Sequence, residues 1–154
     1  MNTEERVRKQ KEMVEEIGRF FDRKGLQPIA GRVMGLLMTM DKELFTFDEI
    51  TEELQISKAS ASNVLRMLET RGDIEYITLP GDRKKYYQIK RQNPSEIFNE
   101  FEKEMKGMVG FLKRLLELKA DKQSKNSVFF NDLIDIISLY LKNLQLQKKT
   151  YKKD

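Results

Sequence analysis

The sequence contains neither cysteine nor histidine, and these two absences exclude several kinds of chemistry. Without cysteine, the chain can form no disulfide and no thiolate metal site. Without histidine, it also lacks the most common general base and the remaining usual ligand for zinc and other transition metals. We therefore do not expect an enzyme, and we expect no metal or other cofactor.

A long apolar run and a leader segment are also missing. No stretch approaches the roughly 20 apolar residues that a membrane-spanning helix requires. The first 16 residues are rich in charged side chains, and no apolar segment follows them. This is not the pattern of a secretory signal. These features predict an intracellular, cytoplasmic protein with no membrane partner.

With only three prolines and eight glycines in 154 residues, the chain has little room for long irregular loops. Charged residues make up 35% of it, which indicates long helices with solvated faces. Hydrophobic periodicity predicts an amphipathic helix over 4–24 and a buried helix over 29–40 that Pro28 opens. Two further helices, with apolar residues at spacings of three and four over 97–115 and 130–144, are joined by a polar loop at 120–127.

The middle of the chain predicts a helix-turn-helix followed by a β-hairpin. Thr46 and Glu49 have the spacing of a capping box and start a short helix that ends near Leu54. Ser57 caps a second helix over 58–70, and Gly72 suits its left-handed end. The period then changes to two over 74–79 and 85–90, which indicates two strands.

These elements predict a mainly α fold with a small β-hairpin wing. In this interpretation, residues 1–25 are an N-terminal dimerisation helix, 26–92 a winged helix-turn-helix domain that binds DNA, and 93–154 a C-terminal helical dimerisation region with a basic tail. The apolar stripes of the long helices favour a homodimer, because a monomer would expose a large apolar patch.

The positive charge is concentrated in one segment. Residues 57–91 hold eight basic and four acidic side chains, whereas the rest of the chain holds 21 of each. Such a local cationic surplus suits the phosphates of double-stranded DNA, although a merely solvated charged face is the alternative. The C-terminal lysines at 148, 149, 152 and 153 are interpreted as a disordered, solubilising tail, with a second binding arm as the alternative.

The helix over 58–70 separates into two faces when each residue advances by 100°. Ala61, Leu65 and Leu68 share a core face with Val64 at its margin, and the opposite face is small, polar and cationic. On that face Asn63 could pair with adenine, and Arg66 with guanine or a phosphate. Ser57, Lys58 and Ser60 lie at the helix N-terminus, which favours phosphate binding. Alternatively, Ser57 is only a cap and the polar face is simply solvated.

The turn Pro80-Gly81-Asp82-Arg83 begins a run of three cations, residues 83–85, which could follow the DNA backbone or place Arg83 in a minor groove. Asp82 either orients the tip through backbone or Arg83 hydrogen bonds, or is an ordinary turn residue. Of Tyr86 and Tyr87, one packs inward and the other offers its hydroxyl to a phosphate. The predicted DNA-binding residues are Ser57, Lys58, Ala59, Ser60, Ser62, Asn63, Arg66, Arg83, Lys84, Lys85 and Tyr87.

The segments 56–69 and 80–87, with Gly72 between them, resemble the MarR-type regulators. Together with the lead-in at 25–33, they look most similar to the branch that contains the repressor of glycine betaine synthesis. The resemblance covers about residues 10–92, and it implies a dimer, a palindromic operator and often a small-molecule effector. The wing departs from the pattern, because the Asp-x-Arg of many MarR wings reads Asp82-Arg83-Lys84 here.

Two further hypotheses concern binding partners other than DNA. A winged helix can also act as a protein-interaction module without sequence-specific DNA binding, and its outer helix face would then be apolar. An effector with a quaternary ammonium group would need an aromatic cage, although aromatic residues at helical spacing are more often core. The residues that could supply such a cage are Phe20, Phe21, Phe101, Phe111 and Tyr140.

Overall fold

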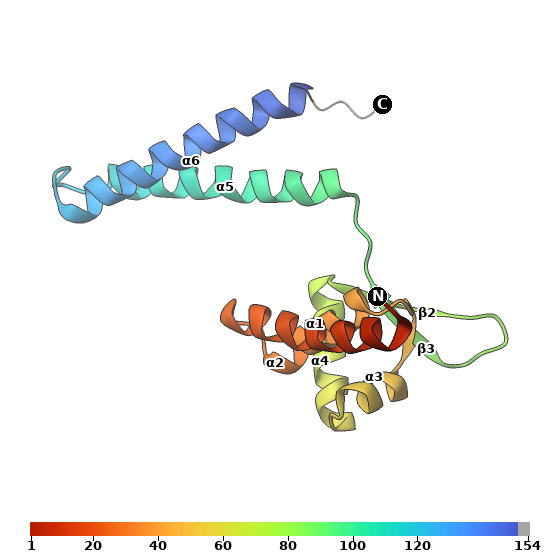
Figure 1. Cartoon of the computed structure of the whole chain (residues 1–154). Helices are drawn as coiled ribbons and strands as arrows, with labels where there is room; N and C mark the ends of the chain where they lie inside the picture. Colours follow the sequence, from red (N-terminus) through yellow and green to blue (C-terminus); the bar gives the residue numbers. More distant parts are fainter. Residues whose placement is uncertain (151–154) are drawn as a thin grey trace. The chain divides into compact units, whose positions relative to one another are not determined.

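In the computed structural model, residues 1–150 are described and divide into two units (Figure 1). The first unit is Met1–Arg91 and the second begins at Gln92. The first contains helices α1 to α4 and the strands β1 to β3, and the second contains helices α5 and α6. Within residues 1–150, none of the helices combines the length and the apolar character that crossing a bilayer would need.

Helices α1 (Thr3–Arg23) and α2 (Pro28–Thr39) pack against each other almost backbone to backbone. A Cβ atom added to Gly31 of α2 would lie 2.9 Å from the Cα of Gly18 in α1, and one added to Gly35 would lie 2.9 Å from the Val14 carbonyl oxygen. The contact joins α1 to the winged helix within one unit, whereas the sequence analysis placed residues 1–25 in a segment of their own.

The local signals of the helix-turn-helix are confirmed. The Thr46 hydroxyl accepts from the Glu49 N–H at 3.3 Å, and the Glu49 carboxylate accepts from the Thr46 N–H at 2.8 Å, so the capping box is complete. This box starts α3 (Phe47–Leu54), and Gln55 ends it in the left-handed conformation with a φ of 52°. Helix α4 (Lys58–Arg71) follows and ends at Gly72, whose φ is 79°.

The predicted hairpin consists of β2 (Ile74–Thr78) and β3 (Lys85–Ile89), and it belongs to a three-stranded antiparallel sheet. The additional strand, β1 (Phe45–Thr46), pairs with the other side of β3, so that the order is β1-β3-β2. The sequence analysis missed β1. Two residues carry no period of their own, and the strand exists only because β3 offers it a partner.

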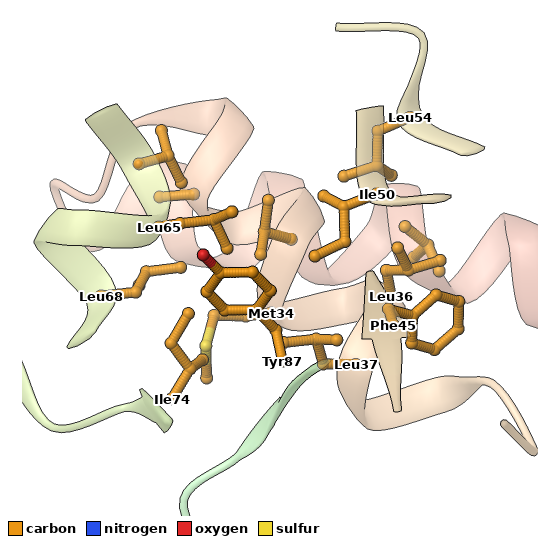
Figure 2. Close-up of a cluster of buried hydrophobic side chains, with 14 residues drawn as sticks. Met34, Leu36, Leu37, Phe45, Ile50, Leu54, Leu65, Leu68, Ile74 and Tyr87 are labelled. Carbon is orange, nitrogen blue, oxygen red and sulfur yellow. The ribbon is translucent and has the colours of Figure 1, made fainter. Parts of the chain in front are cut away.

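The core of the first unit draws side chains from all of its helices and strands (Figure 2). Ile50, Leu65 and Leu68 are among its largest fully buried members, and they fix α3 and α4 to the rest of the unit. Figure 2 shows the ring of Tyr87 among these aliphatic side chains. The buried cluster consists of Val14, Ala30, Val33, Met34, Leu36, Leu37, Phe45, Ile50, Leu54, Val64, Leu65, Leu68, Ile74 and Tyr87.

The second unit is a hairpin of two long helices, α5 (Pro94–Glu117) and α6 (Lys125–Thr150), which lie side by side. The Asn93 side chain caps α5 by accepting from the Ser95 N–H at 2.9 Å. Apolar burial between the helices is limited: within residues 1–150 the buried cluster consists of Leu112, Leu116 and Ile134, and Ile137 and Leu141 of α6 are buried outside it.

A buried carboxylate joins the two helices of this hairpin. Glu102 of α5 is only 7% exposed, and it accepts from Lys106 of the same helix at 2.9 Å and from Lys148 of α6. Lys148 also donates to the Asn99 side chain at 2.7 Å. The prediction of a disordered tail is therefore wrong for residues 148 and 149, which are helical. The other two lysines of that prediction, at 152 and 153, lie outside the described residues.

Candidate nucleic-acid interface

Helix α4 has the two faces that its sequence predicts. Ala61, Val64, Leu65 and Leu68 are buried against the core, and they lie on its inner side. The outer side is exposed to solvent and carries no large apolar side chain. Its exposed residues are Lys58, Ala59, Ser62, Asn63, Arg66 and Thr70, and Ser60 beside them is half-buried.

At the start of α4, the serine hydroxyls are already engaged in capping the helix. The Ser57 hydroxyl accepts from the Ser60 N–H at 3.1 Å and donates to the Ser60 hydroxyl at 2.9 Å. The N–H groups of Lys58 and Ala59 have no acceptor inside the helix, as is usual for a first turn. The cap function of Ser57 is thus shown. Binding of a phosphate by this terminus stays a prediction, and it depends mainly on these N–H groups and on the Lys58 ammonium.

The tip of the wing is a type II turn that is closed by hydrogen bonds. The Asp82 N–H donates to the Leu79 carbonyl at 3.0 Å, and Gly81 supplies the positive φ of 77° that such a turn needs. The Asp82 carboxylate accepts from the Tyr86 hydroxyl at 2.5 Å and from the Lys84 N–H at 2.9 Å. These two bonds lower the pKa of Asp82, and the bond from Tyr86 raises the pKa of that hydroxyl.

The role expected for Asp82, orientation of the tip through the backbone, is confirmed by the bond from the Lys84 N–H. The alternative bond from the Arg83 side chain is not formed within residues 1–150. Instead, the side-chain partner of Asp82 is the Tyr86 hydroxyl. The tip is therefore held together without the use of a cationic side chain.

Tyr87, one of the predicted DNA contacts, is largely buried, and its remaining exposed part lines a cleft beside Arg66 and Lys85. Its side chain is 8% exposed, lies in the hydrophobic core and has a raised pKa because of this burial. Tyr86, which points to the other side of β3, has its hydroxyl bound to Asp82. Alternation along β3 predicts that one tyrosine packs inward, but the period alone does not decide which one, and the inward residue is Tyr87.

Helix α4 and the wing contribute side chains to the same surface. A shallow cleft between α4 and β3 is lined by Ser62 and Arg66 from the helix and by Lys85 from the wing. A neighbouring hollow shares Lys85 and adds Lys84. The Lys85 ammonium lies 4.1 Å from the centre of the Tyr76 ring, which holds it on this side of the sheet. The two basic parts of segment 57–91 therefore converge.

The same cleft contains two residues that the sequence analysis did not include, Glu69 and Phe47. Glu69 follows Arg66 by three residues, so the helical period could have placed it on the same face. Phe47 gives no comparable signal in the sequence. Its position depends on the packing of α3 against the sheet.

The cationic side chains at this surface are the ones that form no ion pair with an acidic side chain within residues 1–150. Arg71 pairs with Asp73 at 2.8 Å and Arg91 pairs with Glu43 at 2.5 Å, and neither was predicted to contact DNA. By contrast, the five predicted contacts that carry positive charge form no ion pair within residues 1–150. These five are Lys58, Arg66, Arg83, Lys84 and Lys85. The unpaired positive charge of segment 57–91 is thus mostly on the candidate interface.

Residues 24–85 of the chain match the MarR family. This match runs from just after α1 to the first residue of β3, and it includes α2, α3, α4, β1 and β2. The HTH-type transcriptional regulator MmpR5 of Mycobacterium tuberculosis is 34% identical to this chain over 79 residues. The matched stretch is 51% of this chain and 48% of that regulator, so it spans about half of each protein.

Two solved structures are similar to most of the chain at lower identity. The crystal structure of a transcriptional regulator is 23% identical, with a TM-score of 0.59 over 93% of this chain and 99% of that one, which supports the fold. MepR, a transcription regulator of a Staphylococcus aureus multidrug efflux pump, is 20% identical. Its TM-score is 0.42 over 84% of this chain and 90% of that one.

Proposed function

We propose that the chain is a transcriptional regulator that binds double-stranded DNA as a homodimer and acts as a repressor in the cytoplasm. The observation that carries the proposal is the shared cleft, which Arg66 of α4 and Lys85 of the wing line together with Glu69, and in which neither cation forms an ion pair within residues 1–150. The match of residues 24–85 to the MarR family supports the same function.

In this proposal, α4 enters the major groove and the wing contacts the neighbouring backbone or minor groove. Ala59 and Ser62 are small and exposed, so they allow the helix to approach the base edges closely. Asn63 then reads adenine and Arg66 reads guanine, because their planar side chains match the donor and acceptor patterns of those bases. Lys84 and Lys85 bind phosphates.

The homodimer is supported by an exposed apolar stripe along α5. The face of α5 towards α6 includes Leu112 and Leu116, which are buried. A second stripe of large apolar side chains, spaced by three, four or seven residues, has no cover within the described chain, and these side chains are 49–88% exposed. This stripe includes Ile97, Phe101, Met108, Phe111 and Leu118. A second copy would cover it, and the two-fold axis would place two α4 helices on a pseudo-palindromic site.

The proposal also includes a small-molecule effector and a relation to one branch of the MarR-type regulators. Four of the five aromatic residues considered for a cage are about half exposed, so they do not act as core in the single chain. These four are Phe20, Phe101, Phe111 and Tyr140. A small-molecule effector of unknown identity stays a prediction from the resemblance to the MarR-type regulators. The relation to the glycine-betaine branch stays a prediction based on the sequence.

The first experiment selects bound fragments from random duplex DNA and measures the affinity of the selected site. We expect an enriched pseudo-palindrome. Arg66→Ala should weaken binding by about 1–3 kcal/mol and relax the preference at one base position in each half-site. Recovery of no enriched sequence would refute sequence-specific DNA binding and favour the protein-interaction alternative, and an unchanged base preference would remove Arg66 from the readout.

A second experiment tests the wing through the salt dependence of binding. Replacing Arg83, Lys84 and Lys85 together by alanine should reduce the slope of log affinity against log salt by nearly three if all three touch phosphates. Arg91→Ala is the matched control, because this arginine is exposed but paired with Glu43. It should leave the slope unchanged. An unaltered slope in the triple variant would show that the wing does not contact DNA.

A further inference from the structure

We propose that Tyr86 is a positioning residue of the wing, whose hydroxyl holds Asp82 so that the neighbouring cations stay free to bind DNA. The inference rests on the proposed function and deepens it, because it explains how a short wing keeps its cations available. It starts from the hydrogen bond of 2.5 Å between the Tyr86 hydroxyl and the Asp82 carboxylate.

The backbone of Tyr86 is fixed in position because it lies in β3, the middle strand of the sheet. It stands opposite Thr46 of β1 on one side and Ile77 of β2 on the other. Its side chain is half-buried, so the position of the ring is set by the sheet and not by the tip. From there the hydroxyl reaches back four residues and connects the turn to the ordered part of the wing.

The bond also decides what the Asp82 carboxylate can attract. One carboxylate oxygen accepts from the Lys84 N–H and the other from the Tyr86 hydroxyl. Because both donors are uncharged, the carboxylate is satisfied without an ion pair to the next side chains. Without the Tyr86 hydroxyl, one oxygen would be free to bind the Arg83 guanidinium or the Lys84 ammonium. That ion pair would compete with a phosphate for the same cation.

The same arrangement reduces the conformational freedom that the tip would lose on binding. The turn is fixed by Asp82 at three points, namely the bond from its N–H to Leu79 and the two bonds to its carboxylate. A binding loop that is already ordered loses less entropy when it meets its partner, and this preorganisation increases affinity. Tyr86 therefore affects DNA binding without a DNA contact of its own.

The test is Tyr86→Phe, which keeps the ring and removes the hydroxyl, measured on the selected DNA site with the full chain. We expect about 2- to 10-fold weaker binding, the range that one hydrogen bond contributes. We also expect a smaller salt slope, because a cation captured by Asp82 releases no counterion from the DNA. Thr78→Val is the matched control, since this exposed threonine of the same hairpin also loses a hydroxyl, and that hydroxyl forms no hydrogen bond within residues 1–150. It should bind as the unmodified chain does.

A combination of variants separates positioning from a merely structural role. In a chain that already carries Arg83→Ala and Lys84→Ala, the further change Tyr86→Phe should have little effect, because neither of the two cations that Asp82 could capture is left. An additive loss would overturn the inference, and so would a Tyr86→Phe protein with unchanged affinity and salt slope. If Arg83→Ala with Lys84→Ala itself leaves binding unchanged, the proposed wing contact fails, which is a different result.

Substitution of Asp82 gives a second, independent measurement. Asp82→Asn keeps an oxygen that can accept from the Lys84 N–H, and its amide can still bond to the Tyr86 hydroxyl while the negative charge is removed. This variant should bind DNA at least as tightly as the unmodified chain. Asp82→Ala loses both bonds and should bind more weakly than Asp82→Asn. Equal affinities of the two variants would show that the bonds at the tip do not matter.

Discussion

The two units of this chain have similar numbers of helical residues, but they bury their apolar side chains to different extents. In Met1–Arg91, the buried cluster has fourteen members drawn from all of its helices and strands, and Gly31 and Gly35 let α1 approach α2 closely. In the second unit, the buried cluster has three members on two helices of 24 and 26 residues. The first unit closes a core of its own, whereas the second leaves much of its apolar surface exposed.

The difference in apolar burial follows from the number of packed layers of helices and sheet that each unit can form. A hairpin of two helices buries one stripe of each helix, and the remaining apolar positions face solvent unless another layer is added. Phe111 of α5 and Ile136 of α6 are 57% and 66% exposed in this way. A unit with a sheet and four helices covers its apolar faces from several sides. We therefore expect the first unit to be stable by itself and the second to depend on the proposed dimer.

The largest expected effect is a break of this dimer by a charge on the exposed stripe. Phe111→Glu should raise the dissociation constant of the dimer at least about 100-fold, because an unpaired charge buried at the interface costs several kcal/mol. Analytical ultracentrifugation across a range of concentrations measures the change. Lys103→Glu is the control, since the same side chain enters an exposed position outside the stripe. If both variants associate equally well, the second copy does not cover this stripe.

A smaller effect, of opposite sign in the two units, is expected from replacing glycine by alanine. Gly31→Ala should destabilise the chain by about 1–3 kcal/mol, because its Cβ would meet the Gly18 backbone at 2.9 Å. Gly107→Ala in α5 meets nothing within 4 Å and should stabilise the chain by up to about 1 kcal/mol. Urea unfolding followed by circular dichroism measures both. A neutral Gly31→Ala would mean that the two helices can move apart freely.

The parts of the fold that could be predicted from the sequence are those fixed by neighbouring residues. The capping box of Thr46 and Glu49 and the helix end at Gly72 need only a few adjacent positions. The outer face of α4 likewise follows from the helical period, and the exposure of Asn63 and Arg66 agrees with it. This is why most of the candidate interface, although not its DNA contacts, could be located before the structure was known.

The parts that could not be predicted depend on contacts between distant residues. Strand β1 exists through its pairing with β3, some 40 residues later, as in the pair of Phe45 and Tyr87. The choice of Tyr87 as the inward tyrosine depends on the packing of α4 over the sheet. The ion pair of Lys148 and Glu102 spans 46 residues, and a run of lysines near the end of the chain gives no sign of it.

The smallest of the three expected effects concerns this ion pair, which is one of the contacts between the helices of the second unit. The two lysines lower the pKa of Glu102 from 4.5 to about 2. Because the pKa is lower in the folded chain, the pair stabilises it above pH 4.5, and this stabilisation is lost as the pH falls towards 2. Glu102→Gln should therefore lower the thermal unfolding midpoint at pH 6 by more than at pH 2.5.

The control is Glu100→Gln, because Glu100 is an exposed neighbour without an ion pair within residues 1–150. This substitution should leave the unfolding midpoint unchanged at both pH values. A difference between Glu102→Gln and the unmodified chain that stays constant over this range would show that the charge of Glu102 does not hold α5 and α6 together.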